Sequence, residues 1–169
     1  MFTSALQLKR APLGAHHVSA TQEELKSDPL GRRLLEVLRG GAIAAPFDEI
    51  SRTPLEIRVP APSKVMGDVV VSSDIDELTV YLGKHTHCHF SLIMYQDRPP
   101  SEAIEIVVHE AVDFLKDLLA DQIVVWSTGS GQQGGTFHRD AQPERLEPAA
   151  RAYLWSGAPF IPPSVRGGA

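Results

Sequence analysis

The stretch that decides the fold runs from Glu77 to Met94 and reads ELTVYLGKHTHCHFSLIM. Its first part alternates between polar and apolar side chains, with one side made of Leu78, Val80 and Leu82. Its last part alternates in the same way, with one side that includes Cys88, Phe90 and Leu92. Because successive side chains of a strand point to opposite faces, the pattern predicts two half-buried strands, 77–82 and 86–94.

Whether the turn between these strands has an odd or an even number of residues decides which faces of the two strands lie together. A two-residue turn at Gly83-Lys84 would pair Leu82 with His85 and set the leucines beside the histidines. A three-residue turn over 83–85 pairs Leu82 with Thr86 instead and keeps the apolar side chains together. We therefore predict the three-residue turn. It leaves a polar face made of Glu77, Thr79, Tyr81, His87 and His89.

Two helices flank this hairpin along the chain. Asp28-Pro29 has the residues of a helix start, an N-cap aspartate before a first-turn proline, and Gly40-Gly41 ends the pattern. This predicts a helix over 29–39. A longer helix is predicted over 102–120, with Ser101 as its cap and apolar residues at helical spacing.

The other predicted strands are short. Residues 55–59 lie between two prolines and predict an edge strand, because proline cannot donate to a central ladder. Further strands are expected at 68–73, 122–127, 135–139 and 151–156. Strands joined by short turns favour an α+β fold, mainly an antiparallel sheet with the two helices packed on one face and the other face partly open. We expect a single domain over 1–169, with irregular extensions at 1–20 and 158–169.

Composition limits the class of partner. The chain has 169 residues, of which 43% are hydrophobic, so it can form a core. A net charge of −5 argues against nucleic-acid binding, which normally needs a basic surface. Cys88 is the single cysteine, so disulfides cannot hold the fold and the cytoplasm is the expected compartment. We also expect no signal peptide and no membrane role, since no apolar run is long enough.

His85, His87 and His89 raise the possibility of a metal site. Two imidazoles that are two residues apart on a strand point the same way and can share one zinc ion. The third ligand would be His85 if the turn allows it, or Tyr81 or Glu77 from the neighbouring strand. The alternative is that His87 and His89 are polar residues of a solvated or partner-facing sheet surface.

Three other patterns that suggest chemistry are each incomplete. His109-Glu110 matches the start of a zinc-peptidase motif, but Asp113 stands where the second histidine is needed. The glycine-rich run 128–135 lacks the lysine of a P-loop, so we expect a hairpin connection there. Cys88 falls on the apolar face of its predicted strand, which argues against a cysteine–histidine nucleophile.

The block from Asp76 to Trp126 joins the strand HTHCHF (85–90) to a long helix that ends FLKDLLAD (114–121), and then to the strand IVVW (123–126). This block resembles small bacterial immunity proteins of polymorphic-toxin systems. The resemblance implies a protein that works by masking a toxin and has no chemistry of its own. It assigns no specific residue.

The sequence therefore predicts a non-enzymatic cytoplasmic binding protein, of the immunity type, without a cofactor. Its partner would be a protein such as a toxin domain, bound through Glu77, Thr79, Tyr81, His87 and His89, because aromatic and polar side chains suit the centre of an interface. The alternative is a metal-binding domain or metal-dependent enzyme built on His85, His87 and His89. A homodimer is also compatible with a half-open sheet.

Overall fold

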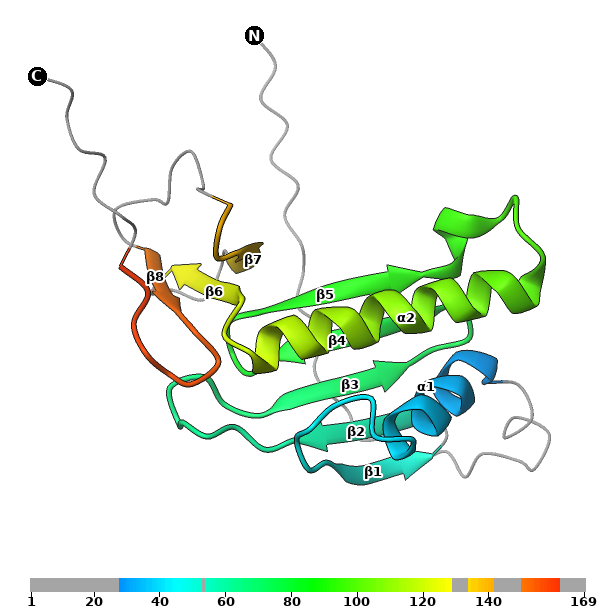
Figure 1. Ribbon diagram of the computed structural model, residues 1–169, viewed down its shortest axis with the longest axis horizontal. Helices are drawn as coiled ribbons and strands as arrows, with labels where there is room; N and C mark the ends of the chain where they lie inside the picture. The colour runs from blue at the N-terminus through cyan, green and yellow to red at the C-terminus, as the bar shows by residue number, and fades with distance from the viewer. Residues whose placement is uncertain (1–27, 53, 129–133, 142–149, 162–169) are drawn as a thin grey trace, which may run out of the picture.

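The computed structural model describes residues 28–52, 54–128, 134–141 and 150–161, which form two α-helices and two antiparallel sheets (Figure 1). The five-stranded sheet contains, in spatial order, β1 (Asp48–Arg52), β2 (Leu55–Val59), β3 (Val69–Ser73), β4 (Glu77–Leu82) and β5 (Thr86–Ser91). In the three-stranded sheet, β6 (Ile123–Thr128) lies between β7 (Gly134–His138) and β8 (Ala150–Tyr153). The helices are α1 (Pro29–Arg39) and α2 (Pro100–Leu119), and a 3-10 turn, η2, spans Leu92–Tyr95. The α+β fold predicted from the sequence is confirmed, although the strands divide between two sheets.

The β4–β5 hairpin has the predicted register. Leu82 pairs with Thr86, Val80 with Cys88 and Leu78 with Phe90, so the turn contains three residues. Gly83 occupies the left-handed region at φ +55°, and its amide donates to the carbonyl of Asp68. The turn therefore packs against the loop that precedes β3, where a Cβ on Gly83 would lie 1.8 Å from the carbonyl oxygen of Met66.

The prediction that β2 is an edge strand is wrong, because β1 pairs with its outer side. Pro54 and Pro60 lie just outside the ends of β2, so neither removes a donor from the ladder. The sequence pattern did not predict β1 because its residues are exposed or half-buried throughout and show no apolar alternation. A break in the register between Glu49 and Ser51 further obscures the strand.

The chain leaves β5 earlier than the alternation of residues 86–94 predicts. The side chain of Ser91 accepts a hydrogen bond from the amide of Ile93 and caps η2, so residues 92–94 turn away from the sheet. Helix α2 starts at Pro100, and Ser101 lies in its first turn, where it does not act as the predicted cap. Helix α1 has its predicted bounds, and its cap is Asp28, whose carboxylate accepts from the Gly31 amide at 2.7 Å.

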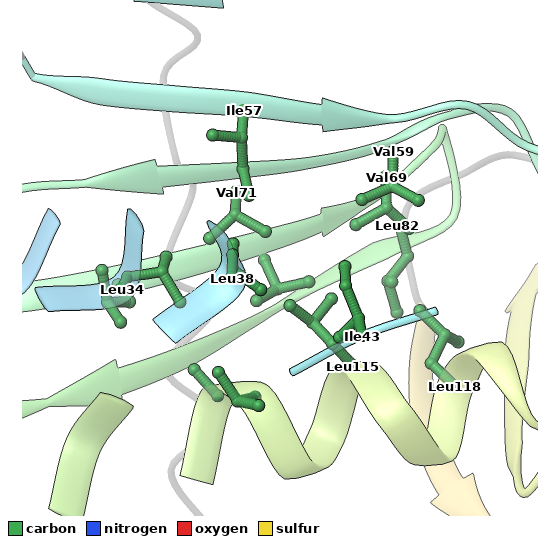
Figure 2. Packing of buried hydrophobic residues seen from close by; sticks show 14 of the residues in the cluster. Leu34, Leu38, Ile43, Ile57, Val59, Val69, Val71, Leu82, Leu115 and Leu118 are labelled. Atoms are coloured by element: carbon green, nitrogen blue, oxygen red, sulfur yellow. The ribbon is translucent and has the colours of Figure 1, made fainter. Parts of the chain in front are cut away.

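Both helices cover the same face of the five-stranded sheet, as predicted (Figure 1). Figure 2 shows side chains from the strands and helices meeting in one layer. Fully buried members include Leu34 and Leu38 of α1, Leu115 and Leu118 of α2, and Ile57, Val71 and Leu82 of the sheet. Burying each such side chain contributes roughly 1.5–3 kcal/mol, which makes the helix-covered face the main source of stability.

The C-terminal part of the described chain packs against the smaller sheet. Residues 158–161 pair back onto β8, with the amide of Phe160 donating to the carbonyl of Ala152 at 2.9 Å. The ring of Phe160 also meets Phe137 of β7 edge-on. Of the irregular extensions expected at 1–20 and 158–169, residues 1–20 and 162–169 lie outside the described residues. In the described part of the chain, neither helix combines the length and apolar character that a membrane span requires.

The fit of Gly83 against Met66 makes a testable prediction. Replacing Gly83 by alanine places a Cβ against a backbone carbonyl and forces a left-handed alanine, so we expect the free energy of unfolding to fall by about 2–4 kcal/mol in urea titrations. Gly41→Ala is the matched control, because Gly41 has φ +85° but no atom within 4 Å of the added Cβ. A Gly83→Ala protein as stable as the Gly41→Ala protein would contradict the packing described here.

Candidate functional site

The predicted polar residues lie on the face of the five-stranded sheet that the helices leave uncovered. Leu78, Val80 and Leu82 of β4 point into the core, so the intervening Glu77, Thr79 and Tyr81 point outward. The ladder places Tyr81 opposite His87 and Thr79 opposite His89. We call the surface formed by Glu77, Thr79, Tyr81, His87 and His89 the histidine face.

Glu77 organises one half of this face through hydrogen bonds. Its Oε1 atom lies 2.6 Å from Nδ1 of His89 and 3.0 Å from Oγ1 of Thr79. A carboxylate can only accept, so both partners donate and the His89 proton sits on Nδ1. The Nε2 atom of a neutral His89 is then left as an acceptor for a partner.

Thr79 is a buried residue that positions its neighbours on the histidine face. Its side chain is on the predicted face, but only 8% of the residue is exposed because its neighbours cover it. It donates to Glu77 and also lies 3.3 Å from Nδ1 of His89. Thr79 therefore positions these two residues and offers little surface of its own.

The other half of the histidine face is a row of three rings. The centroids of Tyr81 and His87 are 5.8 Å apart, and those of His87 and His89 are 4.7 Å apart in an edge-on arrangement. Tyr81 is 44% exposed, and both histidines are exposed. Rings with a polar atom at one end provide contact area and directed hydrogen bonds at a low cost in side-chain entropy.

The outward face of the sheet extends beyond the histidine face onto β3 and β2, two strands that the sequence did not link to the site. Tyr81 pairs with Val70 of β3, and Val70 pairs with Arg58 of β2, so Arg58 and Val70 extend the same face. Arg58 donates to Asp48 at 2.7 Å, and this hydrogen bond raises the pKa of its guanidinium. Only the register of three strands shows this extension, because Arg58 is far from the histidines in sequence.

His85 is not part of the histidine face. It lies in the β4–β5 turn, where its Nε2 donates to the carbonyl of Val65 at 2.9 Å, because a carbonyl can only accept. In the neutral ring Nδ1 is then the acceptor, and it receives the hydroxyl proton of Ser127 across 2.8 Å. Ser127 belongs to β6, and the His85 ring also contacts Tyr153 of β8 at 5.7 Å between centroids. His85 thus connects the two sheets.

The three histidines proposed as zinc ligands are therefore not gathered at one point. Both ring nitrogens of His85 already bond to protein groups, whereas His87 and His89 share the outer face. Within residues 28–52, 54–128, 134–141 and 150–161, no group of three or more His, Cys, Asp or Glu side chains is arranged to hold a metal ion.

Cys88 faces the core side of the sheet, as its register predicts. Its Sγ lies 3.6 Å from Oγ1 of Thr136 on β7. Burial raises the pKa of the thiol, and the hydrogen bond from Thr136 only partly opposes this. A raised pKa leaves less thiolate at neutral pH, which disfavours Cys88 as a nucleophile.

No protein-family model, no curated protein and no solved structure matches this chain.

Because His85 connects the two sheets and His87 is exposed, their substitutions should differ in their effect on stability. We expect His85→Ala to lower the free energy of unfolding by about 1–3 kcal/mol, because it removes two hydrogen bonds between separate parts of the fold. His87→Ala removes an exposed side chain and should cost less than about 0.5 kcal/mol. Urea unfolding of both variants provides the measurement, and equal costs would argue against a structural role for His85.

Proposed function

We propose that this chain is a non-enzymatic cytoplasmic binding protein of the immunity type, which masks a protein toxin through the histidine face. The observation that carries the proposal is the division of the five-stranded sheet: both helices cover one face, while the other presents Tyr81, His87 and His89 side by side. The resemblance of residues 76–126 to immunity proteins supports the same interpretation.

The geometry of the face suits an interface centre. Its side chains come from two paired strands, so their backbone is held rigidly and little order has to be gained on binding. Glu77 fixes the orientation of His89, which presents one nitrogen outward. Tyrosine is among the residues that most often dominate binding energy, and neighbouring polar groups provide specificity.

The arrangement of Ser127 and His85 bears on the non-enzymatic part of the proposal. A serine hydroxyl that donates to a histidine is the first element of a nucleophilic site. Here the same histidine connects two sheets, and its ring is held by Val65 and Tyr153. We assign the pair a structural role and expect no labelling of Ser127 by a fluorophosphonate probe. Labelling that Ser127→Ala abolishes would contradict a purely binding role.

The inhibitor role predicts that a toxin domain is encoded beside the gene for this chain, and coexpression of the two proteins tests it. We expect the wild-type chain to restore growth. Tyr81→Ala and His87→Ala should each weaken toxin binding in calorimetry by about 1–3 kcal/mol, or roughly 5- to 150-fold in Kd, if they behave as interface hot spots. His109→Ala is the matched control, because His109 is an exposed histidine on α2 whose Nδ1 bonds to the Glu105 carbonyl of the same helix.

Two results would contradict this role. One is growth inhibition by the toxin that the wild-type chain does not relieve. The other is a Kd that stays unchanged in both histidine-face variants.

The metal alternative is decided by a separate measurement. Zinc ligation needs unprotonated imidazole, so a zinc site would lose affinity as the pH falls through about 6.5. A chelator would then lower the melting temperature of the protein. We expect an untagged preparation to contain no stoichiometric metal and its melting temperature to be indifferent to chelator. Stoichiometric zinc that is lost in His87→Ala and His89→Ala would favour the metal-binding function instead.

A further inference from the structure

Three large apolar side chains lie exposed at one end of the five-stranded sheet. Ile75 is 69% exposed, Ile93 59% and Met94 76%. Ile75 lies in the turn between β3 and β4, and Ile93 and Met94 lie in η2, which follows β5 (Figure 1). The two segments are adjacent, because the amide of Leu92 donates to the carbonyl of Asp76 at 2.8 Å. Single exposed apolar residues are ordinary on a protein surface, whereas apolar residues exposed together on adjacent segments are typical of an interaction site.

The apolar residues are held in place by the surrounding structure. Ser91 caps η2 from the end of β5, and its hydroxyl donates to the carbonyl of Asp76 at 3.3 Å. At the other end of η2, the hydroxyl of Tyr95 donates to the carboxylate of Glu110 on α2, which raises the pKa of Tyr95. A preorganised apolar surface loses less entropy on binding than a mobile one.

Two acidic residues lie beside Ile75, while Arg98, which follows η2, is paired with Glu102 and Asp97. Asp74 and Asp76 flank Ile75, both are exposed, and neither forms an ion pair within the described part of the chain. The opposite edge of the sheet is different, because the carboxylates of Asp48 and Glu49 are paired with Arg58 and Arg39 respectively. The hydrogen bond from Arg39 keeps the pKa of Glu49 below its usual range. Asp74 and Asp76, unlike Asp48 and Glu49, have no ion-pair partner in the described part of the chain.

We infer that the surface made of Asp74, Ile75, Asp76, Ile93 and Met94, which we call the acidic end, docks a basic amphipathic segment of a protein partner. The inference rests on the proposed binding function and specifies the chemistry of the partner. Apolar side chains of the partner would cover Ile75, Ile93 and Met94, while lysine or arginine at their rim would meet Asp74 and Asp76. The acidic end is continuous with the histidine face, because Glu77 follows Asp76 directly and pairs with Ser91.

A second copy of the chain is a poorer occupant of this surface. A symmetric dimer through the acidic end would bring Asp74 and Asp76 near their own counterparts, and like charges at an interface oppose association. The chain as a whole has a net charge of −5, which adds to this repulsion. Charge complementarity therefore favours a basic partner.

The test uses a defined probe, a fluorescent 18-residue amphipathic peptide of leucine and lysine. We expect it to bind the full chain in anisotropy titrations and to bind less tightly as salt rises. A leucine–glutamate peptide of the same length should not bind. The double substitution Ile93→Ser with Met94→Ser should weaken binding about tenfold or more, since it removes two apolar contacts. Asp74→Asn with Asp76→Asn should weaken it and flatten its dependence on salt.

Ile50→Ser is the matched control, because Ile50 is 52% exposed on β1 beside the paired carboxylates. It should leave peptide binding unchanged. The inference is overturned if the wild-type chain does not bind the leucine–lysine peptide, if the leucine–glutamate peptide binds equally well, or if the acidic-end variants bind like Ile50→Ser. Melting curves of all variants confirm that each is folded.

Tyr81→Ala separates this inference from the proposed function. It lies at the far end of β4 from Glu77, so it should keep peptide binding while weakening binding to the toxin. If all the acidic-end variants still bind the peptide while Tyr81→Ala weakens toxin binding, only the inference is overturned. Peptide binding that behaves as expected without any protection from a toxin would overturn only the proposed function.

Discussion

The register of the β4–β5 hairpin depends on how Gly83 closes its turn. With φ at +55°, Gly83 donates to the carbonyl of Asp68 and leaves no room for a Cβ beside Met66. This contact sets a three-residue turn, and the odd number of residues places Leu82 opposite Thr86. A register shifted by one residue would exchange the two faces of β5 and move His87 and His89 under the helices. The separation between the core and the histidine face follows from this one turn.

The same turn determines that the three histidines serve different purposes. His87 and His89 are in the strand, so their side chains point outward two residues apart. His85 is in the turn, outside the alternation, and its ring reaches Ser127 of the second sheet. A pattern that resembles a three-ligand metal site is therefore divided into a structural bridge and a surface pair. The two exposed rings, together with Tyr81 and the His89–Glu77 hydrogen bond, form the histidine face through which we propose that the chain binds a partner.

The pairing of carboxylates differs between the edge strand β1 and the acidic end. At β1, arginines pair with the carboxylates of Asp48 and Glu49, and a break in register makes the edge irregular, two features that protect an edge strand from unwanted pairing. At the acidic end, the carboxylates of Asp74 and Asp76 have no such partners in the described part of the chain, and apolar side chains are exposed beside them. This difference in charge pairing supports the inference that the exposed apolar residues of the acidic end contact a partner.

The sequence by itself determined the local elements with strong periodic patterns. Helix α1 follows from Asp28-Pro29 and Gly40, and the hairpin and its two faces follow from the alternation of residues 77–91. These features were predictable because periodicity and caps depend on residues within a few positions of each other. The identity of Glu77, Tyr81, His87 and His89 as outward-facing neighbours followed from the same alternation.

Only the tertiary structure decided how these elements combine. β1 has no apolar pattern and exists because β2 offers it a partner, so the sequence placed β2 wrongly at the edge. The pairing of β6 with β8 and the bond between His85 and Ser127 join residues far apart in the chain. Such contacts depend on the packing of whole elements, and no local pattern in the sequence encodes them.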